Sequence, residues 1–263
     1  MVWLTLLIVI PLFLIAFYAF TTSDGGILKF SAANFLEFMR PDLLKVLVRS
    51  LKLSLIATVI CLFAGYPIAL ILAGNTFRKK AILLVLFIAP IWMNFLLRTY
   101  AWLTLLEGTG VINTVLKAVG FEGFHFLGKE SSVVFGMVYN FLPYMVFPIY
   151  ASVSKIPPSL IEAAHDLGSN DFTCLRRIIL PLSLPGILSG ITMVFVPGVT
   201  TFVISQFLGS GNVILIGDII EQQFTKASNW GFGAAISIVV MLVVFLCMYV
   251  VNRFGGDEEV PLL

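Results

Sequence analysis

Residues 162–168 read Glu-Ala-Ala-His-Asp-Leu-Gly, and Ile178 and Leu180-Pro181 follow after a stretch that holds several polar residues. As a pattern this is E-A-A, three residues, G, nine residues, then I-x-L-P. Long apolar runs stand on both sides of it. A polar island between apolar runs is typical of a segment in water beside a membrane, where another protein can touch it.

The composition indicates that the apolar runs are membrane spans. The chain has 263 residues, of which 59% are hydrophobic and 11% charged, and its mean hydropathy is +1.04. Soluble domains carry about 25% charged residues, so an integral membrane protein is predicted. A net charge of +2 is too small to indicate nucleic acid as a partner. The three cysteines, at 61, 174 and 247, have neither metal-ligand spacing nor a disulfide framework, and we expect them to be structural.

Six runs are long enough to cross about 30 Å of hydrocarbon, which takes roughly 20 apolar residues. We expect these spans to be helices, because lipid offers no partner to open backbone groups. Continuous runs without apolar–polar alternation exclude a β-barrel. The first run has no basic flank and no clear cleavage site, so we expect a retained span rather than a signal peptide. The predicted spans are residues 3–20, 54–73, 81–106, 133–152, 185–208 and 232–251.

The spans suggest a division of the chain and an orientation. The basic triplet at 78–80 fills half of a short connection, and short basic loops stay in the cytoplasm. Both termini and the island are therefore expected on the cytoplasmic side. The predicted parts are a first span (1–20), an external loop and lead-in (21–52), a five-helix core (53–252) that includes a cytoplasmic loop (155–181), and a cytoplasmic tail (253–263).

The island itself is predicted to start with a short, firmly capped helix. Pro157-Pro158 ends the preceding helix, because proline removes a donor and clashes in helix interiors. Ser159 and Glu162 form the S-x-x-E pattern of a capping box. Gly168 suits the left-handed position that ends a helix.

A second helix is expected to start near Asn170 or Asp171 and to run to Leu180. Pro181 and Pro185 would then mark the turn into the fifth span. On the caps alone, a plain connector between two spans is the favoured interpretation of these two helices.

The complete pattern resembles the E-A-A loop of the membrane subunits of bacterial ATP-binding-cassette importers. This resemblance implies an all-α type I importer permease fold with six transmembrane helices. It also implies that the helix around residues 163–168 docks into a cleft of the ATPase. The residues that carry the resemblance are Glu162, Ala163, Ala164, Gly168, Ile178, Leu180 and Pro181.

Other segments are similar to the first permease of the spermidine/putrescine importers. Residues 90–102 read P-I-W-M-N-F-L-L-R-T-Y-A-W, and segments 65–67, 209–224 and 230–235 are similar too. The resemblance implies a multi-pass protein of the bacterial plasma (inner) membrane, surrounded by lipid. It implies as partners a second permease, two ATP-binding subunits and a polyamine-binding protein. ATP and Mg²⁺ would be bound by the ATPase, with no cofactor or metal on this chain.

The residues give no sign of catalysis. The chain has no G-x-x-x-x-G-K-[ST] phosphate loop and no G-x-S-x-G serine. Its two histidines, His125 and His165, lie in different loops without catalytic neighbours. We therefore expect a subunit that is not an enzyme.

Several polar and aromatic residues are candidates for lining a substrate path. Arg98 lies in an apolar run at a cost of roughly 2.5–3.5 kcal/mol, so it should face the bundle interior, reach the interface, or pair with Glu107. Amides at membrane depth bond across helices or line a path. Asp218 and Glu221 could attract a polycation or lie on a solvated loop. The candidates are Asn94, Arg98, Tyr100, Asn140, Gln206, Asp218 and Glu221.

Span five contains Pro197-Gly198, where a kink would place the helix beside the cavity. The cargo stays open at this point, because an amino acid, ferric iron or sulfate permease would share the architecture. A secondary carrier is disfavoured by the lack of an internal repeat and of acids inside the spans. A membrane scaffold would not need polar residues at membrane depth.

Overall fold

The fold is that of a computed structural model, which describes residues 2–24, 27–74, 80–120, 123 and 125–254. Helices make up most of the described chain, with one small antiparallel hairpin. In chain order the elements are α1 (Val2–Ala19), β1 (Thr21–Asp24), β2 (Ile27–Phe30), α2 (Ala33–Phe38), α3 (Pro41–Ala73), α4 (Lys80–Trp92), α5 (Phe95–Leu106), α6 (Val111–Ala118), α7 (Glu130–Val153), α8 (Pro158–Asp166), α9 (Asp171–Cys174), η1 (Leu175–Ile179), α10 (Leu180–Thr200), α11 (Val203–Leu208), α12 (Ile216–Thr225) and α13 (Trp230–Phe254).

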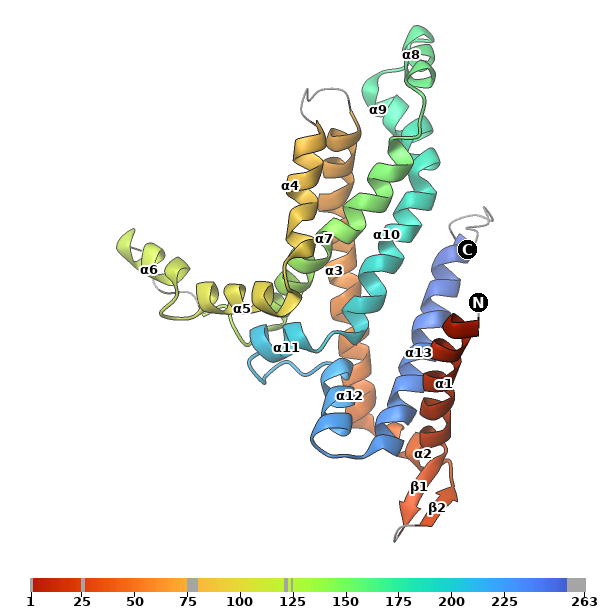
Figure 1. The fold of residues 1–263 in the computed structure, drawn as a ribbon. Helices are drawn as coiled ribbons and strands as arrows, with labels where there is room; N and C mark the ends of the chain where they lie inside the picture. Colours follow the sequence, from red (N-terminus) through yellow and green to blue (C-terminus); the bar gives the residue numbers. More distant parts are fainter. Residues whose placement is uncertain (1, 25–26, 75–79, 121–122, 124, 255–263) are drawn as a thin grey trace.

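Long helices run side by side and define the long axis of the molecule (Figure 1). Within the described ranges, four helices are long and apolar enough to cross a membrane, and α1 is a shorter apolar helix. The long helices are Pro41–Ala73, Glu130–Val153, Asp171–Thr200 and Trp230–Arg253. The α8–α9 segment stands at one end of the molecule and the β1–β2 hairpin at the other (Figure 1). This arrangement confirms the prediction of an all-α membrane protein.

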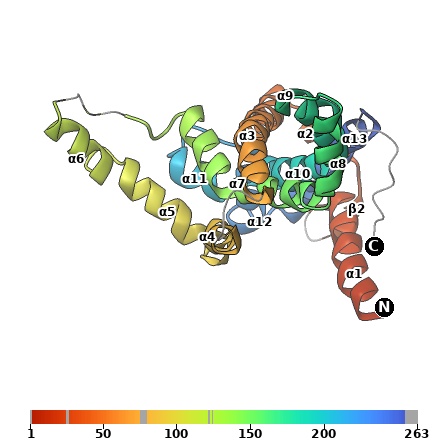
Figure 2. The ribbon, with the colours of Figure 1, turned by 90° about the horizontal axis from the view of Figure 1, so that it is seen from above.

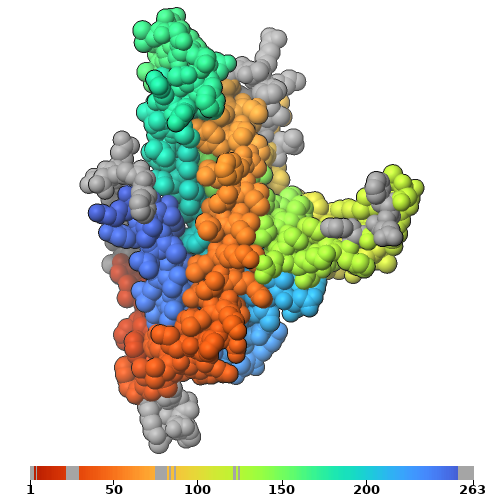
Figure 3. Space-filling view, turned by 180° about the vertical axis from the view of Figure 1, so that it is seen from behind, coloured from red at the N-terminus to blue at the C-terminus, as the bar shows by residue number. Residues whose placement is uncertain are grey.

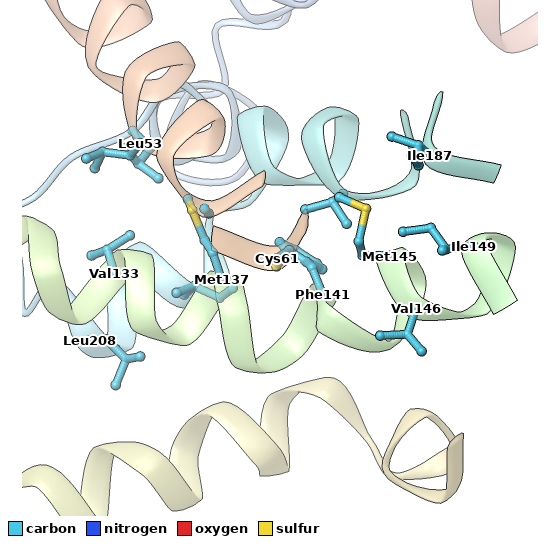
Figure 4. Close-up of a cluster of buried hydrophobic side chains, with 14 of the residues drawn as sticks. Leu53, Cys61, Val133, Met137, Phe141, Met145, Val146, Ile149, Ile187 and Leu208 are labelled. Carbon is cyan, nitrogen blue, oxygen red and sulfur yellow. The ribbon is translucent and has the colours of Figure 1, made fainter. Parts of the chain in front are cut away.

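The main core lies where α3, α7 and α10 meet. Figure 4 shows Cys61 of α3, Met137 and Met145 of α7 and Ile187 of α10 turned toward one another. Glycine permits the close approach, since a Cβ built on Gly190 would lie 2.7 Å from the sulfur of Met145. Small residues serve this purpose in membrane bundles, where packing rather than water drives association.

A second group of buried side chains joins α10, α12 and α13. Phe195, Ile216, Ile236 and Val240 belong to it. The fully buried Ala19 packs α1 against α13 through a separate small cluster. The space-filling view shows α3 lying along most of the back face, with the α8–α9 end projecting beyond the bundle (Figure 3).

The prediction of one continuous third span is wrong. Residues 81–106 form two helices, because α4 ends at Trp92 and α5 starts at Phe95. The Asn94 Oδ1 accepts hydrogen bonds from the amides of Leu96 (2.8 Å) and Leu97 (3.4 Å), so it caps a new helix. From this corner α5 and α6 extend away from the bundle as an arm, on the opposite side from α1 (Figure 2).

The predicted bounds of the fifth span are also wrong. The helix starts far earlier than residue 185 and ends at Thr200, after which Thr201 is extended and α11 runs separately. Pro197 lies inside the helix, and the break follows it by a few residues. A Cβ built on Gly198 would lie 2.5 Å from the Ser54 hydroxyl oxygen, so this glycine serves close packing of α10 on α3.

The remaining predicted spans correspond to α1, α3, α7 and α13. Helix α3 is longer than predicted and starts at Pro41. It therefore continues without interruption across position 53, where the five-helix core was predicted to begin. Of the residues used for orientation, Arg78 and Lys79 lie outside the described residues, as do residues 255–263 of the predicted tail. The orientation and the division into parts stay predictions.

Candidate functional site

The loop after α7 begins with a helix whose start differs from the prediction. Helix α8 has Pro157 at its N-cap and Pro158 in its first turn, and no side chain caps it. Ser159 therefore lies inside the helix, and the predicted capping box with Glu162 is wrong. Proline fits a first turn because its missing N–H has no helical partner there, so this helix starts two residues earlier than a cap at Ser159 would place it.

The end of α8 is as predicted. Gly168 has φ +81°, in the left-handed region. Its N–H donates to the carbonyl of His165 (2.8 Å), and the N–H of Ser169 donates to that of Ala164 (3.0 Å). This pair of bonds is the Schellman arrangement, which satisfies carbonyls that a helix end would leave free. No atom lies within 4 Å of a Cβ built on Gly168, so the backbone conformation alone requires glycine.

The second helix starts as predicted and continues further. The Oδ1 of Asn170 accepts from the N–H of Thr173 (2.8 Å), which caps α9 at Asp171. The chain then passes through the π-turn η1 into α10, so the predicted turn at Pro181 and Pro185 is wrong. Pro181 stands in the first turn of α10, where it has no N–H to donate to the preceding turn. The wider π-turn η1 lies directly before this position. Ile178 lies in η1 and Leu180 at the start of α10.

The tip of the loop formed by α8 and α9 exposes two apolar side chains that the sequence pattern did not single out. Leu167 is 90% exposed and Phe172 is 70% exposed, on either side of the Gly168 turn. Glu162 and Ala163 are exposed too, while Ala164 is buried. Exposed apolar residues on a rigid tip are typical of a protein contact. The signal was present in the sequence as apolar residues within a polar stretch.

Arg98 and Asn140 are both buried in the bundle. Arg98 is 5% exposed, and its Nε and Nη1 have no hydrogen-bond partner in the described part of the chain. Among the described residues no ion pair joins it to Glu107, so the predicted alternative of that pair does not occur. Asn140 is 1% exposed, donates to the carbonyl of Gly136 (2.9 Å), and keeps an unpartnered Oδ1. Asn94 is exposed and acts as a cap rather than bonding across helices.

Asp218 is buried rather than part of a solvated loop, and it is 3% exposed. Its Oδ2 accepts from the N–H of Leu215 (2.8 Å), and the N–H of Ile216 donates to the Ser50 hydroxyl (2.8 Å). Asp218 therefore caps the start of α12, and the Ser50 hydroxyl joins that start to α3. Burial raises the pKa of the Asp218 carboxyl above its usual range, against the opposing effect of the Leu215 hydrogen bond.

Gln206 and Glu221 are brought together although 15 residues separate them. The Gln206 amide donates to the Glu221 carboxylate (3.2 Å), which also accepts from the Thr225 hydroxyl (2.8 Å). Glu221 stands at a cavity of about 530 Å³ whose other walls are mainly apolar and come from α10, α12 and α13. Tyr100 is half-exposed on α5 and meets the ring of Phe207 edge-on, with 6.0 Å between centroids.

No group of three or more His, Cys, Asp or Glu side chains that could hold a metal occurs in the described part. The candidate site therefore has two parts. One is the exposed loop formed by α8 and α9, and the other is a set of separate polar residues on α5, α7, α11 and α12.

A family model described as "Binding-protein-dependent transport system inner membrane component" matches residues 1–255. Among characterised proteins, the chain is 35% identical to the spermidine/putrescine transport system permease protein PotB of Haemophilus influenzae, over 95% of this chain and 90% of that protein. It is 36% identical to the protein of the same name from Escherichia coli, over 95% of this chain and 93% of that protein.

Solved structures support the fold. A bacterial ABC transporter involved in import of the acidic polysaccharide alginate matches with a TM-score of 0.81 at 16% identity, over 97% of this chain and 91% of that one. The inward-facing MetNI methionine ABC transporter matches with a TM-score of 0.61 at 17% identity, over 83% and 97%. At these identities the likeness concerns the fold of the membrane subunit alone.

Proposed function

Because the chain belongs to the family of binding-protein-dependent transport system inner membrane components, we propose that it is one of two permease subunits of an ATP-driven polyamine importer. The chain is an ABC importer permease of the PotB type, in the inner membrane. The cargo, the partners and the route of coupling are inferred in addition. Its partners are a second permease, two ATP-binding subunits that bind the ATP and Mg²⁺, and a polyamine-binding protein.

The coupling role rests on the loop between α7 and α10. A helix end fixed by two backbone hydrogen bonds resists fraying, so it can pass a push along α7 and α10 without melting. Leu167 and Phe172 supply apolar anchors for a cleft, and Ala163 lets the helix approach closely. Apolar anchors in a water-excluding pocket contribute most of the energy at protein interfaces.

The polyamine cargo is inferred from the similarity to named relatives. Proteins named as spermidine/putrescine permeases share 35% and 36% identity with nearly the whole chain. An amino acid, ferric iron or sulfate permease remains the competing function of the same architecture. A secondary carrier working alone is disfavoured because the family consists of subunits that depend on a binding protein.

Glu221, which accepts a hydrogen bond from Gln206, is the acid that we place against the substrate. The Glu221 carboxylate borders a mainly apolar cavity, which suits a cation carried on a methylene chain. Tyr100 offers a half-exposed ring that packs edge-on against the ring of Phe207. Asn94, Arg98, Asn140 and Asp218 keep the helices in place in this proposal, and direct contact with substrate is assigned to none of them.

The test is ATPase activity after reconstitution in lipid with the neighbouring permease, the ATPase and the binding protein. We expect spermidine-loaded binding protein to stimulate hydrolysis several-fold, and amino-acid-loaded protein to leave it unchanged. Hydrolysis that is indifferent to polyamines would contradict the cargo and leave the coupling intact. Failure of the ATPase to bind the permease pair would contradict the coupling itself.

A further inference from the structure

A serine of α3 bonds to the end of α10. Helix α10 ends at Thr200, and the chain comes back to it as α12, which starts at Ile216. The Ser54 hydroxyl donates to the carbonyl of Phe195, in the last turns of α10 (2.8 Å). Ser54 is fully buried, and the glycine at position 198 lets α10 come this close to it. Serine bonds of this kind join helices in membrane bundles.

A second serine of α3 bonds to the start of α12. The N–H of Ile216 donates to the hydroxyl oxygen of Ser50 (2.8 Å), which lies one helical turn before Ser54 and is also fully buried. Ile216 is the first residue of α12, and the first N–H groups of a helix have no partner within it. Ser50 therefore caps α12 from another helix, beside the Asp218 carboxylate that accepts the N–H of Leu215.

The end of α10 and the start of α12 also touch through their backbones. A Cβ built on Gly217 would fall against the carbonyl oxygens of Thr200 and Thr201. Only glycine permits an approach of this kind, so α12 starts directly against the end of α10. Ser50 and Ser54 are about 6 Å apart along the axis of α3. One short stretch of α3 thus bonds to both helix ends.

The cavity beside Glu221 is built around this junction. Val196 of α10 and Gly217 of α12 line the cavity. Each directly follows a residue whose backbone bonds to α3, namely Phe195 and Ile216. The walls that α10 and α12 contribute are therefore both attached to α3.

We propose that Ser50 and Ser54 form a two-point brace, which fixes the α12 wall of the cavity relative to the α10 wall and so positions the Glu221 carboxylate. Glu221 follows the braced end of α12 by little more than one helical turn, so a shift of that end moves the carboxylate. The two serines are positioning residues and act through Glu221. The contact of Glu221 with substrate rests on the proposed function, whereas the brace rests on the hydrogen bonds to α3.

Uptake kinetics test the positioning role. Ser50→Ala and Ser54→Ala should each raise KM for spermidine about fivefold and leave the maximal rate within about twofold, because substrate binding is what the carboxylate supplies. Ser183→Ala is the matched control. Ser183 is a buried serine of α10 whose hydroxyl lies 3.1 Å from that of Tyr66 on α3, in the half of α10 away from the junction.

The control distinguishes positioning from a general loss of packing. Each of the three variants loses a buried hydrogen bond of α3 with α10 or α12, so a merely structural role predicts similar kinetics in all of them. We expect KM of Ser183→Ala to stay within about twofold of the wild type, as befits a site remote from the cavity. The same KM in Ser50→Ala, Ser54→Ala and Ser183→Ala would overturn the positioning role.

A double variant shows whether the serines act through Glu221. In the Glu221→Gln background we expect Ser50→Ala to leave KM unchanged, because no carboxylate is left to position. The same rise in KM with and without the carboxylate would overturn positioning through Glu221. An unchanged KM in Glu221→Gln alone would contradict the proposed substrate contact and the positioning with it, while the brace is decided by a measurement without substrate.

That measurement is amide hydrogen exchange of the full-length chain in lipid. Ser50→Ala removes the acceptor of the Ile216 N–H, so the peptide that covers the start of α12 should exchange at least about tenfold faster. Ser54→Ala should accelerate the same peptide although its hydroxyl bonds to α10, because a brace loosens when either point is lost. Ser183→Ala should leave that peptide unchanged. A response to Ser50→Ala alone would overturn the joint action of the serines, and a response to neither would overturn the brace.

Discussion

The N–H of Ser169 donates to the carbonyl of Ala164 at 3.0 Å, across a glycine in the left-handed region. This bond closes α8 and aims the chain back toward the bundle as α9. Everything that the coupling loop presents to a partner depends on that turn. Leu167 immediately precedes it, and Phe172 follows at the start of α9.

Gly168→Pro should abolish uptake while the chain still inserts. Proline fixes φ near −65°, whereas this turn has φ +81°, so the two hydrogen bonds at the helix end are lost. Gly168→Asn is the matched control, because asparagine adopts left-handed φ at little cost and the space around the Cβ is open. We expect the asparagine variant to retain most of its uptake. Equal loss in both variants would mean that the turn conformation is not the reason.

Leu167→Asp and Phe172→Asp should each weaken binding of the ATPase subunits about tenfold or more, because apolar anchors at an interface contribute over 1 kcal/mol each. Both residues are exposed, so the melting temperature of the isolated chain should not change. Leu36→Asp is the control: Leu36 is 72% exposed on α2 at the opposite end of the molecule. Co-purification of the ATPase with the membrane subunits is the measurement. Undiminished co-purification of both variants would place the contact elsewhere.

Glu221→Gln should raise KM for spermidine uptake about tenfold, which corresponds to roughly 1.4 kcal/mol. The carboxylate is the acid that borders the cavity, and its loss removes the attraction for an ammonium group. Gln206 still has an acceptor in the variant amide, so folding should be kept. Glu37→Gln is the control, since this exposed acid lies on α2 and pairs with Arg40, which precedes α3. An unchanged KM for Glu221→Gln would remove Glu221 from the path.

Apolar run length was sufficient to predict α1, α3, α7 and α13, because the cost of placing polar groups in lipid decides whether a segment spans. It failed for the third and fifth spans. Mean hydropathy reports transfer into lipid and does not detect a change in backbone direction. The Asn94 side chain accepts from two amides and starts a new helix there, but one asparagine hardly changes the mean hydropathy of the run. A polar residue inside an apolar run can therefore cap a new helix as well as form a hydrogen bond between helices.

The coupling loop was predictable in its glycine turn and in the start of α9, since both depend on local backbone bonds within a few residues. The start of α8 was not, because the pattern S-x-x-E fits equally well when proline moves the helix start upstream. The burial of Asp218 could not be predicted either. It depends on α12 packing against Ser50, 166 residues away from Ile216 in the chain.

Asp218→Ala should destabilise the chain by about 1 kcal/mol, the usual effect of losing a helix cap. The carboxylate accepts the N–H of Leu215, and alanine leaves that buried donor without a partner. Asp218→Asn keeps an oxygen at this position, so it should melt at least as high as the wild type at pH 7. The melting temperature of the full-length chain in lipid is the measurement.

The pH dependence of stability distinguishes the helix-capping role of Asp218 from the effect of its charge. Burial raises the pKa of Asp218 in the folded chain, so the neutral acid is favoured there. Its contribution to stability is then complete below the unfolded value of about 3.9 and is lost as the pH rises through the folded pKa. The wild type should therefore lose stability relative to Asp218→Asn as the pH rises above about 4, and the gap should stop growing once the acid is fully ionised. A gap that is constant with pH would mean that the Asp218 carboxyl titrates alike in the folded and unfolded chain, and that its burial carries no electrostatic cost.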